Sequence, residues 1–185
     1  MSHTSSVPRL QLRAFVPGDF ETYARYHRQP AVYRYLYTEA PQEPAVLQAQ
    51  FVRDALPQRL AQDGDTRRYA VVRSSDGCLL GETLLKLASA AARQAELGYI
   101  FDPAHGGQGY ATEAVALTLA QGFGPLGFHR IFARLDAANQ GSVGVVERLG
   151  MRREAHLIEN DQFNGQWGDE YIYALLAREW HSRAG

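Results

Sequence analysis

The sequence predicts a single α/β (α+β) domain in which helices flank a mixed, mostly antiparallel sheet of about seven strands. The chain has 185 residues, of which 45% are hydrophobic and 21% charged, and this size and composition suit one globular domain with a sizeable core. Three strand-like runs follow one another in the middle of the chain, which predicts an antiparallel meander. The later part alternates strands with helices, so the predicted sheet is mixed.

The first third of the chain predicts one strand and two helices. Apolar and polar residues alternate over 10–14, which is typical of a half-buried strand. Asp19 ends this segment and can cap the helix that follows. A second helix is predicted over 44–62, because apolar residues recur there every four positions, and Pro57 should end or kink it.

The middle of the chain predicts the meander. Runs of strand-forming residues lie at 68–73, 78–87 and 94–101. The first two runs are separated by Ser-Ser-Asp-Gly at 74–77, and Asp-Gly is a strong hairpin signal. The Ala-rich stretch 88–92 separates the last two runs and is predicted to be a loop.

The second half of the chain alternates helical and strand-like segments. The predicted elements are, in order, a helix over 112–121, a strand over 129–135, a helix over 139–149, a strand over 152–158, a polar loop over 160–168 and a strand over 170–176. Gly150 ends the second of these helices. We expect flexible tails at 1–8 and 182–185 around one domain over 9–181.

Charge and cysteine content exclude several classes of protein. Nineteen basic and twenty acidic residues give a net charge of −1, so no overall field favours nucleic acid or a membrane as partner. The one cysteine, Cys78, excludes an intramolecular disulfide and fits a reducing compartment. The chain shows no secretory leader and no run of about 20 apolar residues, so we expect a cytoplasmic protein.

A glycine-rich loop joins a predicted strand to a predicted helix. Its sequence is Gly106-Gly107-Gln108-Gly109-Tyr110-Ala111-Thr112. The amides at a helix start lack intrahelical partners and can converge on an anion such as a pyrophosphate, and glycines let the anion approach the backbone. A tight turn without a ligand is the alternative. The absence of Gly-Lys-Ser/Thr excludes a P-loop, and the missing third glycine disfavours a dinucleotide fold.

A second motif follows one strand later. The segment Asn139-Gln140-Gly141-Ser142, ending in Leu149-Gly150-Met151, resembles the Asn-x-x-Ser…Leu-Gly-Phe segment of GNAT N-acetyltransferases. With Glu-Leu-Gly-Tyr-Ile-Phe-Asp-Pro at 96–103 and Gly-Tyr-Ala-Thr-Glu-Ala at 109–114, the chain resembles the RimJ/RimL-type branch, the ribosomal-protein N-terminal acetyltransferases. The resemblance covers roughly residues 10–180 in order of elements, although its specific motifs lie in the second half.

The resemblance implies acetyl-CoA as co-substrate. In this family the loop amides bind the pyrophosphate, and the preceding strand pairs with the pantetheine arm in a V-shaped splay between two parallel strands, here those ending near Phe101 and Leu135. One departure is that the family loop begins with Gln, Arg or often Trp, where this chain has Gly106. The cofactor-binding residues predicted in this way are Tyr99, Ile100, Phe101, Gly106, Gly107, Gln108, Gly109, Tyr110, Ala111, Thr112, Asn139 and Ser142.

Acyl transfer to an amine requires a base, a polarised carbonyl and a proton for the leaving thiolate. Glu96 is the first candidate base because it lies on the strand that carries the thioester, and a salt-bridged strand residue is the alternative. Asp161 is the second candidate, near an acidic residue of RimL-like relatives, and its alternative is a turn-forming Asp. Ser142 could protonate the thiolate or only cap its helix, and Asn139 could bind pantetheine or cap. Following the family, an amide of a bulged strand near 98–100 would polarise the carbonyl.

Other chemistries are disfavoured. An acyl-enzyme on Cys78 is less probable than direct transfer in a ternary complex, because no histidine is expected nearby. The six histidines show no metal-ligand spacing, so we expect no metal. Aromatic residues over 23–37 could line an amine pocket or only pack, and no acidic cluster occurs there, which disfavours polycations.

The predicted function is therefore acetyl transfer to a primary amine, either a protein N-terminal α-amine or a small-molecule amine. The alternative is a catalytically inactive CoA-binding module. Family precedent makes a homodimer possible.

Overall fold

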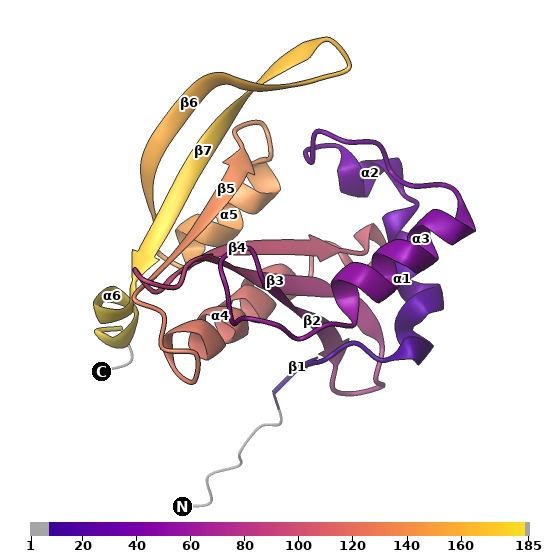
Figure 1. Ribbon diagram of the computed structural model, residues 1–185, viewed down its shortest axis with the longest axis horizontal. Helices are drawn as coiled ribbons and strands as arrows, with labels where there is room; N and C mark the ends of the chain where they lie inside the picture. Colours follow the sequence, from indigo (N-terminus) through magenta and orange to yellow (C-terminus); the bar gives the residue numbers. More distant parts are fainter. Residues whose placement is uncertain (1–7, 184–185) are drawn as a thin grey trace, which may run out of the picture.

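The structure is a computed structural model and describes residues 8–183, so residues 1–7 and 184–185 of the expected tails lie outside the described residues. Its centre is a seven-stranded sheet in the order β1-β2-β3-β4-β5-β7-β6, with helices on both faces (Figure 1). Every neighbouring pair is antiparallel except β4 and β5, which are parallel. The predicted fold class is confirmed.

The predicted elements follow one another in the expected order, with shifted ends and two added short helices, α2 and α6. The strands are β1 (Leu10–Arg13), β2 (Thr66–Arg73), β3 (Leu79–Ser89), β4 (Gln94–Phe101), β5 (Arg130–Asp136), β6 (Arg152–Phe163) and β7 (Gln166–Leu176). The helices are α1 (Phe20–His27), α2 (Pro30–Tyr33), α3 (Pro44–Gln50), α4 (Tyr110–Phe123), α5 (Gln140–Arg148) and α6 (Ala177–His181). Two short 3-10 helices, η1 (Pro17–Asp19) and η3 (Pro103–His105), and one π-helical segment, η2 (Phe51–Ala55), complete the set.

Successive side chains of a strand point to opposite faces of the sheet, and this alternation builds two cores. On β4, Ala95 and Leu97 pack with Val115 and Leu119 of α4, and we name this side the α4 face. Ile100 points the other way and packs with the aromatic cluster beneath α1 and η2, which we name the α1 face. The parallel pair of β4 and β5 is reached through α4, which crosses between them.

Some expectations about elements differ from the structure. The helical segment that begins at Pro44 ends at Ala55 and not at residue 62, and its end just before Pro57 agrees with the expectation that this proline would end or kink it. The short helices α2 and α6 were not expected. The polar loop expected over 160–168 is largely strand: β6 and β7 pair up to Phe163↔Gln166 and turn through Asn164 and Gly165, both with positive φ. An exposed hairpin is rich in polar residues, so its composition resembles that of a loop.

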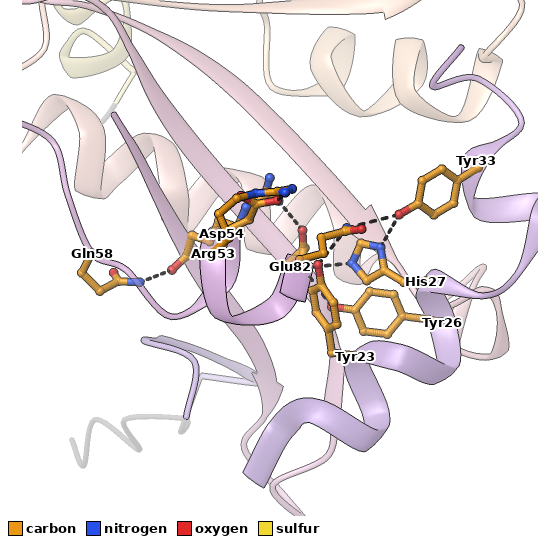
Figure 2. Close-up of polar contacts among 10 residues, drawn as sticks. Tyr23, Tyr26, His27, Tyr33, Arg53, Asp54, Gln58 and Glu82 are labelled. Carbon is orange, nitrogen blue, oxygen red and sulfur yellow. Dashed lines mark hydrogen bonds and ion pairs between the residues drawn. The ribbon is translucent and has the colours of Figure 1, made fainter. Parts of the chain in front are cut away.

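A buried polar network fastens α1 and α2 to the sheet (Figure 2). At its centre is Glu82 of β3, whose side chain is completely buried. Its carboxylate accepts hydrogen bonds from Tyr26 at 3.0 Å and Arg68 at 2.5 Å, and His27 Nε2 lies 3.4 Å away. The other ring nitrogen of His27 lies 2.7 Å from the hydroxyl of Tyr33, in α2. The network therefore runs from the sheet through α1 to α2.

The carboxylate of Glu82 is ionised despite its burial. Burial alone would raise its pKa, but the contact with His27, the charge of Arg68 and the hydrogen bond from Tyr26 outweigh burial and lower the pKa below the ordinary value. Because the folded pKa is lower than the unfolded one, Glu82 contributes stability above the unfolded pKa, and this contribution is lost as the pH falls through the folded pKa.

Replacing Glu82 with Gln tests this role. We expect E82Q to lower the free energy of unfolding at pH 7 by roughly 3 kcal/mol, since it leaves Arg68 without its charged partner. In urea titrations the deficit should shrink as the pH falls below about 4.3, the ordinary pKa of Glu. Exposed Glu21 provides the control, and E21Q should have little effect. A deficit of E82Q that is the same at all pH values would contradict the assignment.

Candidate active site

The sheet opens between β4 and β5. These strands pair only at Gln94↔Arg130, Ala95↔Ile131 and Glu96↔Phe132, whereas β5 and β7 stay paired to Asp136↔Glu170. The rest of β4 and the rest of β5 therefore diverge, which is the V-shaped splay predicted between the strands ending near Phe101 and Leu135. An opened parallel pair leaves backbone donors and acceptors unpaired along both inner edges.

Which backbone groups face the opening follows from the pairing of β3 with β4. The amide of Asp102 bonds the carbonyl of Leu80, and antiparallel pairs alternate in their bonding. The backbone groups of Leu97, Tyr99 and Phe101 therefore point toward β5, and those of Ile100 point toward β3. The expectation of a bulge near 98–100 was wrong, because the register between β3 and β4 is continuous from Ala95↔Leu87 to Phe101↔Gly81.

The glycine-rich loop follows β4 and begins α4. Gly107 and Gly109 have φ of +75° and +80°, a region that other residues rarely adopt. The first amide with a partner in the helix is that of Glu113, which bonds the carbonyl of Gly109. The amides of Tyr110 and its two successors are thus free of helical partners and form a site for an anion.

Gly106 differs from the other loop glycines. Its φ is −64°, which any residue can adopt, and a Cβ there would lie 3.2 Å from the carbonyl oxygen of Pro103. The backbone does not require glycine at this position. The departure from the family pattern therefore removes a side chain and leaves the amides of the loop in place.

The buried carboxylate of Asp102 fixes the start of the loop. It caps η3 by accepting from the amide of Ala104 at 3.0 Å, and Arg25 of α1 donates to it at 3.0 Å. Burial would raise the pKa of Asp102, but these hydrogen bonds outweigh burial and lower it. The loop is thereby tied to α1 on the opposite side of the sheet.

Asn139 and Ser142 meet β4 from the α4 face. The side-chain oxygen of Asn139 caps α5 by accepting from the amide of Ser142 at 3.1 Å. The hydroxyl of Tyr99 donates to the carbonyl of Ser142 at 3.1 Å, and burial raises the pKa of Tyr99 to about 12. The capping role of Asn139 is therefore present in the structure, and Ser142 stands beside the strand that borders the splay.

A cleft of about 610 Å³ connects the loop, α5 and the splay. Every residue predicted to bind the cofactor lines this cleft, from Tyr99 through the glycine-rich loop to Ser142. Glu96 and Asp161 are not among its lining residues.

Two parts of the cleft were not predicted for the cofactor. One wall is formed by Ala31, Val32, Tyr35 and Leu36, on and after α2, and of these only Tyr35 is among the aromatic residues expected either to line an amine pocket or to pack. The other is Arg148, whose guanidinium donates to the hydroxyl of Thr112 at 3.2 Å and places a positive charge at the start of α4. Helical spacing could have revealed Arg148, because residues 142, 145 and 148 share one side of α5.

The two candidate bases both act on one arginine on the other side of the splay. Glu96 is on the α1 face by strand alternation, and its charge and that of Asp161 both act on Arg134 of β5. Arg134 pairs with Glu170 at 2.7 Å, the main cause of its raised pKa. Asp161 is exposed and accepts from the amide of Gln162, but it lies within β6 and pairs with Gly168, so it does not form a turn.

Several carboxylates therefore lie on the α1 face. They come from strands of the sheet, whereas the segment 23–37 contributes no acidic cluster. Glu170 is nearly buried, and Asp136 lies beside it at the end of β5. Against Arg134, the four carboxylates give this region a negative charge that suits a cationic amine.

Comparison with known proteins agrees with this geometry. Residues 9–152 match the model of the acetyltransferase (GNAT) domain, which is more than half of the chain. The chain belongs to the GNAT family. The motifs that predicted this membership lie within the matched range or at its end.

Relatives and solved structures of GNAT proteins resemble the chain along its length. It is 32% identical over 117 residues to the uncharacterized N-acetyltransferase YnaD of Bacillus subtilis, covering 63% of this chain and 68% of that protein. It is 26% identical to a spermidine N(1)-acetyltransferase of Vibrio cholerae, covering 95% and 98%. The crystal structure of a GNAT-family acetyltransferase from Bacillus anthracis superposes with a TM-score of 0.82 at 26% identity, covering 94% of this chain and 98% of that one.

These findings make the chain an acetyl-CoA-dependent acyltransferase, and as a GNAT enzyme it uses an amine as acceptor. The expectation that no histidine lies near Cys78 was wrong, because the Nε2 atom of His105 is 3.7 Å from the Cys78 sulfur. His105 lines the GNAT cleft but Cys78 does not.

Within residues 8–183 no group of three or more His, Cys, Asp or Glu side chains could hold a metal ion. In the same described part, no helix has the length and apolar character needed to cross a membrane.

Substitution of the loop glycines tests the cofactor assignment. G107A forces a side chain into a positive-φ position with open space around it, at a cost of roughly 1–2 kcal/mol. We expect the KM for acetyl-CoA to rise about tenfold, measured by thiol release. G106A is the matched control, since its φ is ordinary, and it should have the smaller effect. Equal effects of both variants would contradict the role of the loop conformation.

Proposed function

We propose that this chain transfers the acetyl group of acetyl-CoA directly to a primary amine that approaches from the α1 face. The splay beyond Glu96↔Phe132 carries the proposal, because it connects the two faces of the sheet. The pantetheine arm would pass from the loop into the splay and pair with the backbone of Tyr99 and Phe101. The amine would meet the thioester from the side where the carboxylates gather.

The candidate residues divide between the two faces in a way that suits this reaction. The neutral amine attacks the thioester carbonyl, so a carbon–nitrogen bond forms and the carbon–sulfur bond breaks. Glu96, on the α1 face, would take a proton from the amine nitrogen. Ser142, on the α4 face beside Tyr99, would donate a hydrogen bond or proton to the thiolate. Asp161 would be the base only if the amine enters along the hairpin of β6 and β7.

The acceptor is a cationic primary amine in this proposal. An N-terminal α-amine, with a pKa of about 7.7–8.0, requires only a weak base, and the resemblance to the RimJ/RimL branch supports it. Three carboxylates act on Arg134, and Asp136 pairs with one of them across β5 and β7; this group also supports a small polycation, and a spermidine acetyltransferase is among the relatives. Residues 23–37 contain no acidic cluster, but the carboxylates of the α1 face come from strands outside that segment. Cytoplasmic location and homodimer formation stay predictions.

An amine panel with acetyl-CoA tests the proposed function. We expect thiol release that depends on the amine, together with a mass increase of one acetyl group on the acceptor. The panel should contain peptides with free N-termini, the same peptides N-terminally blocked, and spermidine. Initial-rate lines that intersect would support a ternary complex, and C78A should stay active. Tight CoA binding with no amine-dependent thiol release would support the inactive CoA-binding module instead.

Isosteric variants of the two carboxylates separate the candidate bases. If Glu96 accepts the proton, E96Q should lower kcat by about 10²-fold with little change in the KM for acetyl-CoA. D161N should then retain most of the activity and serves as the matched control. Full pH–rate profiles of both variants are the measurement. Loss of activity in D161N but not in E96Q would assign the base to Asp161.

A further inference from the structure

Tyr37 has an unusual conformation for its residue type. It lies four residues after α2 and has φ of +52°, a left-handed value that is rare for a bulky side chain. Such a conformation persists only where surrounding contacts fix it, and these places are often functional. Two contacts fix Tyr37, and both come from the strands on the far side of the splay.

The first contact is a hydrogen bond across the splay. The hydroxyl of Tyr37 donates to Asp136 Oδ2 at 2.5 Å. The other oxygen of Asp136 accepts from the amide of Ala138 at 2.7 Å, in the turn that leads to Asn139 and α5. Tyr37 therefore links the segment after α2, which forms one wall of the cleft, to the turn that carries the opposite wall.

The second contact is with β7. Gly168 lies beneath the ring of Tyr37, and a Cβ at this glycine would clash with the tyrosine hydroxyl. Gly168 does not have a positive φ, so its backbone would accept alanine. Glycine at this position provides room for Tyr37 and does not serve a turn.

The hydroxyl of Tyr37 remains a donor over a wide pH range. Burial, the hydrogen bond to Asp136 and the nearby charges of Asp136, Asp161 and Glu170 all raise its pKa. The phenol thus stays protonated beside the carboxylates of the α1 face. By donating a hydrogen bond it stabilises the charge of Asp136 at the end of β5.

We propose that Tyr37 is a positioning residue for the acceptor, because its bond to Asp136 fixes the segment after α2 over the acidic side of the splay. This inference rests on the proposed function. Tyr37 is not among the residues lining the cofactor cleft, so its loss should act on the amine more than on acetyl-CoA.

Two variants break the same bond by different means. Y37F removes the hydroxyl, and G168A displaces it while leaving Tyr37 and Asp136 chemically unchanged. We expect each to raise the KM for the best amine about tenfold, the effect of losing one charge-assisted hydrogen bond, with smaller changes in kcat and in the KM for acetyl-CoA. The double variant should be no worse than either single one, because only one bond can be lost. G18A, where a Cβ meets open space, is the control for added methyl groups.

Hydrogen exchange supplies a measurement that does not require turnover. Backbone amides over 34–40 should exchange about tenfold faster in both variants than in the wild type or G18A. An unchanged exchange rate, or an amine KM unchanged in Y37F while the wild type is active, would overturn the inference. A wild type that acetylates no amine, with exchange faster in both variants, would refute the proposed function and leave the positioning of the segment supported.

Discussion

The loss of pairing between β4 and β5 after Glu96↔Phe132 is the constraint on which the rest of the site depends. A continuous sheet would satisfy these backbone groups internally and close the passage between its faces. Because the strands diverge, two inner edges remain with free donors and acceptors, and a cleft of about 610 Å³ forms along one of them. The glycine-rich loop adds its helix-start amides at the end of that cleft. The groups that the splay and the loop offer to a cofactor are thus mainly backbone groups.

An opening in a sheet must be held at a fixed width, and three polar contacts around it do so. Arg25 holds Asp102 at the end of β4, Tyr99 holds the carbonyl of Ser142, and Tyr37 holds Asp136 at the end of β5. The buried network around Glu82 adds to these three contacts, because it fixes α1 and α2 against β3 (Figure 2). Replacing such a network with apolar side chains could give similar stability, so its value lies in fixing one arrangement of α2.

The two sides of the splay have opposite electrostatic character. On the α4 face, helix-start amides and Arg148 favour the phosphates of the cofactor. On the α1 face, carboxylates from β4, β5, β6 and β7 favour a cation. In the function proposed above, this charge difference would direct the anionic cofactor and the cationic amine to different faces. This separation allows both to meet at the thioester without competing for one entrance.

The sequence by itself determined the order of elements, the glycine-rich loop and the Asn139 to Ser142 motif, because these depend on local periodicity and on residues within one turn of each other. The positive φ of Gly107 and Gly109 and the cap by Asn139 are local in the same sense. Only the tertiary structure decided which carboxylates share a face, since Glu96, Asp136, Asp161 and Glu170 come from four different strands. The contacts of Tyr37 also follow only from the tertiary structure. Its bond to Asp136 joins residues 99 positions apart, and no local pattern specifies a contact over that separation.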